Sequence, residues 1–495
     1  MRVDGGSHTQ CDGTTDAPYV AGGGRACAFR HPFDAIPPRD STRTAPLQGG
    51  DVLFIGAGDY AIGAGVVTDS GYAGCNSSAG GIGYDCEVGS IPSGTAERPT
   101  RIVGAGFDRG CSDAPEFWGT WRTPSILNLT NADHISIACL DLTDHQDCTR
   151  NHASSDFRCD TGIGVVEGYA NSGIYATDSE DVQLTDLRIH GLDTGVYAAR
   201  IADWTLDRVV IRGNVSAGFD GDVSGDDHNG GTITFRDGEI SWSGCIERYP
   251  DSNAEPVGCL SQDRGGYGDG LGTGATGGRW IFERFNFLYN VSDGLDLLYL
   301  DTPEAHVEVR ESHFEGNGGN AIKVAQSGHL IHDVSIVANC GFLAQPRWPD
   351  MVNPCRAQGA GISLGTGALE NVVENVTLWA EGDCAITSNG GRVSLRNSIL
   401  VGNGEYLQTD DRACFVYGDP APTVSGTVNV INGFKTSNNG CAHGINASGA
   451  MGCADPMLRA VSTGSRMDPG FDFDLRLSPT SPFVDHVPPL GALSR

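Results

Sequence analysis

Short runs of alternating apolar and polar residues recur along the chain, and each run ends in glycine, asparagine or aspartate. One run begins at Asp181 and reads D-V-Q-L-T-D-L, and another begins 22 residues later at Asp203. Further copies begin at His306, His332 and Arg392. Alternation with a period of two predicts β-strands with one buried face. The longer period of amphipathic helices is nearly absent, so the pattern predicts an all-β chain.

A second short strand follows these runs, for example at residues 173–176 and 321–324. A repeat of about 22 to 30 residues that holds two or three strands is typical of one coil of a solenoid. Leucine-rich repeats require regularly spaced leucine and asparagine positions that this chain lacks, and a β-propeller blade is longer and has four strands. We therefore predict a single-stranded right-handed parallel β-helix with long, disulfide-pinned loops.

The predicted coils are clearest between residues 126 and 401. Residues 1–45 are rich in glycine, proline and cysteine, and we expect this segment to cap the open end of the first coil. We assign residues 46–495 to the β-helix and expect its segment 471–479 to close it. Because each coil buries its apolar face on its neighbours, a chain of this length can form one structural domain.

The cysteines indicate an oxidising compartment. The chain has 16 of them and no C-x-x-C motif, which disfavours zinc ribbons and thioredoxin-like redox sites. We expect at least five disulfides between neighbours in sequence and a secreted or periplasmic protein whose export signal has been removed, although a set of reduced structural thiols is the alternative. The near-neighbour pairs are Cys11/Cys27, Cys75/Cys86, Cys111/Cys139, Cys148/Cys159, Cys245/Cys259, Cys340/Cys355, Cys384/Cys414 and Cys441/Cys453.

The formal net charge of −30 restricts the partners of the protein. Nucleic-acid binding requires clustered positive charge, which this composition does not favour. No stretch approaches the roughly 18 consecutive apolar residues of a membrane span. An anionic polysaccharide remains compatible with the acidic charge if a bound metal ion supplies local positive charge. We expect a monomer that binds such a polysaccharide.

Lysine is rare in this chain, which has only Lys323 and Lys435 against 30 arginines. Lys323 stands between two apolar residues of a predicted strand and therefore points outward. Asp296 precedes it by 27 residues and Asp269 precedes Asp296 by another 27, so we expect the three in one column on adjacent coils, with Asp293 at the bend beside them. A lysine, unlike an arginine, can lose its proton near neutral pH and act as a base. The alternative is that the aspartates are solvated turn residues and Lys323 is only an ion-pair partner.

Two sequence segments resemble the core of the family 9 pectate lyases. Residues 290–297 read N-V-S-D-G-L-D-L, and residues 315–324 read E-G-N-G-G-N-A-I-K-V. The family pattern has an asparagine-rich turn, two adjacent aspartates, glycine, an apolar residue and aspartate, followed about a coil later by Gly-Asn-Gly, a hydrophobic residue and lysine. Here the first adjacent aspartate is Ser292, and Ala-Ile-Lys stands where the family has Gly-Phe-Lys.

The resemblance, which covers residues 269–324, implies a function. It implies that Asp269, Asp293 and Asp296 bind Ca²⁺ and that Lys323 is the catalytic base. Calcium on a uronate carboxylate would stabilise the negative charge that develops when the base removes the C5 proton. The 4-linked sugar then leaves by β-elimination.

The sequence therefore predicts a calcium-dependent polysaccharide lyase that cleaves a uronate-containing polysaccharide. We expect Arg264 and Arg356, on long loops, to contact the polyanion. Cofactors such as ATP, NAD and flavin have no support, because the glycine-rich runs are turns between strands and no phosphate-binding lysine loop occurs.

Two other classes of function stay open. A glycoside hydrolase or an epimerase is the enzymatic alternative, since paired carboxylates serve as acid and base in β-helix hydrolases. A non-catalytic carbohydrate-binding or adhesive surface protein is the other alternative. A dense acidic cluster on a glycine-rich loop could serve the hydrolase, and solvated residues or a structural-ion site are the alternative for it. It consists of Asp220, Asp222, Asp226, Asp227 and His228.

Overall fold

The protein is represented by a computed structural model of the full chain. The structure describes residues 1–39, 41–63, 87–119, 123–144, 169–223, 228–248, 251–261, 267–344, 347–351, 355, 361–380, 384–402, 414–420, 422–432, 434, 455–460, 474–485 and 491–492. These residues form two compact units: residues 1–229 with 246–257 make the first, and residues 230–245 with 258–495 make the second.

The first unit is a stack of parallel strands. The strand series β1–β3–β6–β7–β8 pairs in parallel, and β2, β4, β5, β9 and β10 add parallel neighbours. Its elements are α1 (Pro32–Ala35), β1 (Val52–Ile55), β2 (Asp59–Ile62), β3 (Thr100–Gly104), the short 3₁₀ helix η4 (Phe107–Arg109), β4 (Glu116–Gly119), β5 (Ser125–Asn128), β6 (Ile135–Asp144), β7 (Ser172–His190), β8 (Thr194–Asp207), β9 (Val210–Arg212) and β10 (Phe219–Gly221).

The second unit contains three rows of parallel strands, and each coil contributes one strand to each row. The row that concerns the candidate site, called the site row below, consists of β15 (Leu271–Thr273), β18 (Leu295–Leu297), β21 (Ile322–Val324), β24 (Ile362–Leu364), β27 (Cys384–Thr387) and β30 (Cys414–Tyr417).

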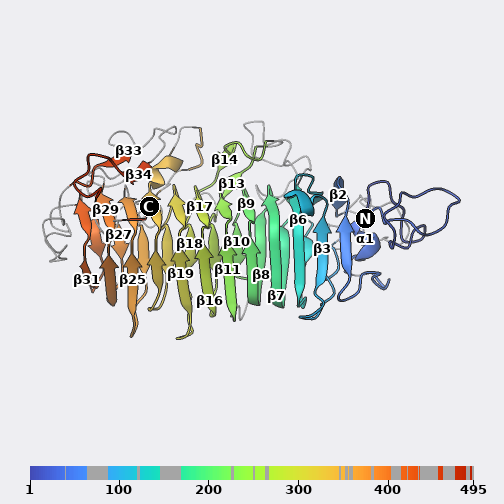
Figure 1. Cartoon of the computed structure of the whole chain (residues 1–495), viewed down its shortest axis with the longest axis horizontal. Coiled ribbons are helices and arrows are strands. Elements are labelled where there is room, and N and C mark those ends of the chain that lie inside the picture. Colours follow the sequence, from blue (N-terminus) through green and yellow to red (C-terminus); the bar gives the residue numbers. More distant parts are fainter. Residues whose placement is uncertain are drawn as a thin grey trace. The chain divides into compact units, whose positions relative to one another are not determined.

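The strands of each of the other two rows also lie side by side, as the arrows of β16, β19 and β25 illustrate (Figure 1). One row is β11 (Thr232–Arg236), β16 (Arg279–Glu283), β19 (His306–Arg310), β22 (Leu330–His332), β25 (Glu370–Glu374), β28 (Arg392–Arg396) and β31 (Thr423–Thr427). The other is β12 (Glu239–Ser241), β17 (Asn286–Leu288), β20 (His313–Glu315), β23 (Ser335–Ala338), β26 (Thr377–Ala380), β29 (Ile399–Gly402) and β32 (Val430–Asn432).

Four further strands and a short helix complete the described elements. The 3₁₀ helix η6 (Cys340–Leu343) follows β23, and β13 (Cys245–Ile246) and β14 (Gly258–Cys259) flank residues 247–257. Near the end of the chain, β33 (Leu458–Ala460) pairs antiparallel with β34 (Asp474–Leu477). Leu475 of β34 packs against Val337 and Trp379, so this tail covers the outer side of the row that contains β23 and β26.

The alternating pattern explains why the coils stack. In the site row, Leu295 pairs with Ile322 and Ile322 pairs with Ile362, and all three side chains are fully buried. Apolar residues of successive coils therefore form continuous columns inside the solenoid, and the residues between them point outward. Aromatic rings also stack in the interior, where the Phe287 and Phe314 centroids lie 5.0 Å apart.

The predicted fold class is confirmed, because the chain is all-β and its parallel strands wind as a solenoid. Four predicted cysteine pairs form disulfides, Cys11–Cys27, Cys111–Cys139, Cys245–Cys259 and Cys340–Cys355. The pairs Cys75/Cys86, Cys148/Cys159 and Cys441/Cys453 lie outside the described residues. The division into a cap at 1–45 and a β-helix at 46–495 stays a prediction. No described helix has the length and apolar character needed to cross a membrane.

Candidate functional site

Outward-facing residues of the site row form one continuous column. Asp296 pairs with Lys323, Lys323 with Ser363, Ser363 with Thr387, and Thr387 with Tyr417. Asp296, Lys323 and Ser363 each stand between inward-facing apolar residues of their strands, so their side chains point away from the core. Thr387 and Tyr417 continue the same register at the ends of β27 and β30. The column therefore begins in charged residues and continues as hydroxyl-bearing ones.

Asp269 does not belong to this column, and the prediction that it does is wrong. The residue that pairs with Asp296 on the preceding coil is Gly272. The equal 27-residue spacing fails because the step from Gly272 to Asp296 is 24 residues. Asp269 lies instead at the bend before β15, where its Oδ1 accepts a hydrogen bond from the backbone N–H of Asp293 at 2.9 Å. The two bend aspartates therefore stack on each other, and the column aspartate lies beside them.

Asp293 is held rigidly at the bend. Its side chain is 1% exposed, and its Oδ1 accepts hydrogen bonds from the backbone N–H and the side-chain amide of Asn320 at 2.5 and 2.8 Å. A Cβ atom on Gly319 would lie 2.1 Å from Oδ1 of Asp293, so only glycine permits this close approach. The Gly-Gly-Asn sequence before β21 is thus explained by the carboxylate that it surrounds.

Lys323 joins the bend to the column. Its Nζ donates to Oδ2 of Asp296 at 2.8 Å and to Oδ2 of Asp293 at 3.1 Å. Burial by itself would lower the pKa of this ammonium, but the charges of Asp293 and Asp296 outweigh burial and raise the pKa. In this arrangement Lys323 is a cation that neutralises part of the acidic cluster.

The three aspartates form a compact carboxylate cluster. One oxygen from each of Asp269, Asp293 and Asp296 lies within 4.8 Å of the others. Burial, followed by the charge of Asp293, raises the pKa of both Asp269 and Asp296. One ammonium cannot balance three ionised carboxylates, so the cluster has an excess of negative charge when fully ionised. Converging carboxylate oxygens are the ligands that Ca²⁺ prefers.

Gly272 leaves space beside this cluster. A Cβ atom at this position would lie 3.1 Å from both Oδ2 of Asp269 and the hydroxyl of Tyr267. The backbone of Gly272 does not adopt a positive φ, so chain conformation does not require glycine here. The missing side chain instead keeps open a space next to carboxylate and hydroxyl oxygens. The residues present therefore fit a hard divalent cation such as Ca²⁺, in donor chemistry and in available room.

The serine that departs from the lyase pattern has a structural role. Ser292 is fully buried, and a hydrogen bond from its side chain to Asp269 favours the ionised form of that carboxyl. A buried asparagine pair supports the same turn, because the Asn290 side-chain amide donates to Oδ1 of Asn317 at 2.9 Å. The segment that resembles the lyase core is thus a continuous hydrogen-bonded bend rather than an exposed loop.

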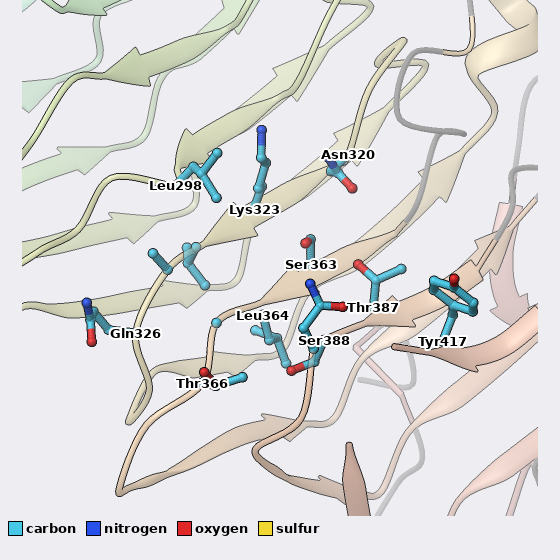
Figure 2. Close-up of a pocket in the computed structure, with 14 residues that line it drawn as sticks. Leu298, Asn320, Lys323, Gln326, Ser363, Leu364, Thr366, Thr387, Ser388 and Tyr417 are labelled. Atoms are coloured by element: carbon cyan, nitrogen blue, oxygen red, sulfur yellow. The ribbon is translucent and has the colours of Figure 1, made fainter. Parts of the chain in front are cut away.

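A groove opens beside Lys323 and follows the site row toward β30. Its volume is about 570 Å³, and it is lined by Leu298, Asn320, Lys323, Val324, Ala325, Gln326, Ser363, Leu364, Gly365, Thr366, Thr387, Ser388, Asn389 and Tyr417. Figure 2 shows Lys323, Ser363, Thr387 and Tyr417 on successive strands, with Asn320 and Leu298 beside the lysine. Lys323 therefore connects the charged cluster to a groove whose lining mixes polar and apolar side chains.

Arg264 and Arg356, the predicted substrate contacts, lie outside the described residues, as do Asp226 and Asp227 of the acidic loop. Asp220 belongs to the first unit, where it pairs with Tyr197. Its negative charge, together with the larger effect of burial, raises the pKa of Asp193 to about 7.

Sequence reasoning missed Gly272, Asn320 and the groove residues Ser363, Thr387 and Tyr417. Gly272 was detectable in principle, because L-G-T at 271–273 aligns with L-D-L at 295–297 once a 24-residue coil is allowed. The groove residues were harder to find, since a 40-residue step separates Lys323 from Ser363 and their residue types are common at surfaces.

Comparison with known proteins finds solved structures of low similarity. No protein-family model and no curated protein sequence matches the chain. An alginate lyase from Paenibacillus sp. is 13% identical with a TM-score of 0.35, and the match covers 76% of this chain and 91% of that chain. The A-module of a mannuronan C-5 epimerase from Azotobacter vinelandii is 13% identical with a TM-score of 0.33, covering 77% and 91%. The catalytic domain of a GH87 α-1,3-glucanase is 12% identical with a TM-score of 0.37, covering 75% and 63%.

Proposed function

We propose that the protein is a calcium-dependent polysaccharide lyase that cleaves a uronate-containing polysaccharide by β-elimination. The observation that carries this proposal is the position of Lys323, which contacts two of three clustered carboxylates and borders a polar groove. A lysine amine beside a candidate divalent-cation site is suited to removing a proton from a carbon next to a carboxylate. The absence of an arginine at this position is consistent with that role, because an arginine keeps its proton.

Asp269, Asp293 and Asp296 would hold the calcium ion. When bound, the ion would supply positive charge that stabilises a uronate carboxylate as negative charge develops on it, and it would offset the carboxylate charges that keep Lys323 protonated. Asn320 and Gly319 keep Asp293 in place, and the Leu298 backbone N–H does the same for Asp296 through a 2.9 Å hydrogen bond. The protein would thus present a prearranged ligand set rather than assemble one on binding.

The reaction would proceed from the neutral amine of Lys323. The amine takes the C5 proton of a uronate, the C5–H electron pair forms the C4–C5 double bond, and the bond from C4 to the glycosidic oxygen breaks. The departing oxygen takes a proton from solvent, which yields one unsaturated end and one new hydroxyl end. Asn320 and Ser363, which flank Lys323 in the groove, would orient the sugar through their polar groups.

Ultraviolet absorbance tests this proposal against its alternatives. A lyase creates an unsaturated product that absorbs, a hydrolase releases reducing ends without the new absorbance, and an epimerase changes the sugar without cutting the chain. The proposal predicts absorbance that appears with calcium, stops with a chelator and returns when calcium is restored. Reducing ends without absorbance would contradict it.

A glycoside hydrolase is the second candidate, and the carboxylate cluster is the observation that favours it. The raised pKa values of Asp269 and Asp296 are suited to a general acid near neutral pH. The cluster oxygens lie within 4.8 Å of one another, which disfavours an inverting enzyme, whose carboxyls lie roughly 6.5–9.5 Å apart, but not a retaining one, whose carboxyls lie roughly 5–5.5 Å apart. Lys323 also has no required role in that chemistry, so the lyase accounts for more of the site.

The disulfides indicate an extracytoplasmic protein, because such bonds persist in oxidising compartments. We infer secretion or a periplasmic location from them. Arg264 and Arg356 remain the proposed contacts to the uronate carboxylate from their loops.

A further inference from the structure

The groove beyond Lys323 has a distinct chemical character. Among the described residues that line it, Lys323 is the one cation, and its Nζ already contacts Asp293 and Asp296. The rest of that lining consists of hydroxyls, side-chain amides and small or apolar residues. The described part of the groove therefore holds no cation that could balance an acidic sugar on each coil.

Three described arginines of the second unit pair with carboxylates outside the groove lining. Arg284 forms a two-pronged contact with Asp237, at 2.6 and 2.9 Å. Arg279 pairs with Glu308 at 2.8 Å, and Arg310 pairs with Glu283 at 3.0 Å. All three lie in or next to the β16–β19 row rather than the site row. These three described cations are thus engaged on another row of strands, and Lys323 remains the one cation of the described groove lining.

The groove does offer what a neutral sugar requires. The hydroxyls of Ser363 and Thr387 have no hydrogen-bond partner among the described residues, so they can form hydrogen bonds with sugar hydroxyls. Tyr417, one coil further, is 58% exposed and presents an aromatic ring on which the apolar face of a pyranose can stack. Asn389 adds an exposed amide beside them. Figure 2 shows Ser363, Thr387 and Tyr417 in sequence along the groove.

We propose that the three coils after Lys323 bind neutral sugars, so that the substrate is a heteropolysaccharide in which a uronate at Lys323 is followed on this side by uncharged residues. The inference rests on the proposed lyase function and makes its substrate class specific. Three coils span roughly 14 Å at about 4.8 Å per coil, enough for a short oligosaccharide segment.

Electrostatics favours this substrate over a homopolymer of uronates. A homopolymer would bring carboxylates to the part of the groove formed by Ser363, Thr387 and Tyr417, where the described lining offers no cation to pair with them. Unpaired like charges brought together in a groove cost enough to change affinity by an order of magnitude or more. A neutral segment avoids this cost and uses the hydroxyl groups instead.

The test compares polymers that differ in charge spacing. Turnover by the calcium-loaded enzyme would be measured on polygalacturonate and polymannuronate, which are uronate homopolymers, and on deacylated gellan and the rhamnogalacturonan backbone, whose uronates are separated by neutral sugars. The inference predicts kcat/KM at least about tenfold higher on a polymer with separated uronates. It also predicts that Thr387→Arg, which adds a cation to the groove, improves turnover of a homopolymer at least about tenfold.

Binding is measured on the same polymers by affinity gel electrophoresis. Tyr417→Ala should weaken retardation by a polymer with separated uronates, whereas Tyr299→Ala, a control at an equally exposed tyrosine outside the groove lining, should not. Homopolymer turnover equal to or faster than the others, unchanged by Thr387→Arg, would overturn the inference and leave the lyase proposal standing.

Cleavage of no polymer, with Tyr417-dependent retardation intact, would refute the lyase proposal and support the neutral-sugar groove as a binding site. No cleavage together with no Tyr417-dependent retardation would refute both.

Discussion

Replacement of Lys323 by methionine tests whether the ammonium and a calcium ion compete for the same carboxylates. Methionine keeps much of the side-chain length and removes the charge. The Lys323, Asp293 and Asp296 side chains are at most 16% exposed, so solvent screens their two contacts weakly. Removing one partner of such a buried ion pair typically costs about 3 kcal/mol or more, because the remaining charges are left without compensation.

The expected result depends on calcium. In a chelator, Lys323→Met should lower the free energy of unfolding by about 3 kcal/mol. The effect on calcium binding has the opposite sign, because the ammonium repels a cation held by the same carboxylates. At an assumed separation of about 4 Å and an effective dielectric constant of about 20, it would oppose a divalent ion by up to about 8 kcal/mol, twice the value for two unit charges. The flexible lysine can move away and recover part of that energy, so we expect calcium affinity to increase at least about tenfold, equivalent to about 1.4 kcal/mol.

Denaturant unfolding in chelator and titration calorimetry with calcium measure the two effects. Arg109→Met, a change at a cation whose side chain is 63% exposed and pairs with Asp113, serves as the control; it should leave calcium binding unchanged and alter the free energy of unfolding by less than about 1 kcal/mol. Unchanged or weaker calcium binding by Lys323→Met would refute the reasoning, because it would mean that the ammonium and the ion do not share Asp293 and Asp296.

Two further predictions concern the same cluster. Gly272→Ala should lower calcium affinity and uronate cleavage while the protein stays folded, because the new Cβ would lie 3.1 Å from Oδ2 of Asp269. An unchanged calcium affinity in titration calorimetry would refute the idea that Gly272 leaves room for the ion. Burial and the charges of Asp293 and Asp296 raise the Asp269 pKa to about 7. The native state therefore binds a proton that the unfolded state has lost, so in chelator stability should fall as pH rises from about 4 to 7. Asp269→Asn should make the free energy of unfolding depend less on pH between about 4 and 7. An unchanged pH dependence would mean that groups other than Asp269 cause it.

The sequence predicted the fold well for a physical reason. Each coil repeats the same requirement, an apolar column inside and polar residues outside, so the period-two pattern appears many times. The segment around Asp293, Asp296 and Lys323 was also predictable, since the strands β18 and β21 are separated by 27 residues without an insertion. The 27-residue spacing between Asp296 and Lys323 therefore predicted correctly that the two residues pair on adjacent strands.

Spacing failed where coil length changes. The coil between Gly272 and Asp296 is shorter, so counting back by 27 residues moved Asp269 from the bend into the column. The coil between Lys323 and Ser363 contains a 40-residue step with an inserted loop, which hides their pairing from any periodicity search. Register in a solenoid is set by hydrogen bonding between neighbouring strands, and loops of any length are compatible with it.

The ion pairs of Lys323, like the changes in coil length, could not be predicted from the sequence. The sequence left open whether this lysine is a base or a charge partner, and the structure places it within hydrogen-bond distance of two carboxylates. Its raised pKa makes it a charge partner in this arrangement. The proposed function requires bound calcium to lower the pKa of Lys323 so that its amine can act as a base. This step therefore needs a direct test.

The most direct test is the turnover of uronate polymers by Lys323→Arg at saturating calcium, followed by ultraviolet absorbance of the unsaturated product. Arginine can keep the ion pairs with Asp293 and Asp296 but cannot give up its proton near neutral pH. The account predicts a folded protein whose cleavage rate is lower by at least about 10²-fold, the usual scale of lost general-base catalysis. Full activity in Lys323→Arg would contradict it, because the residue would then act only through its charge.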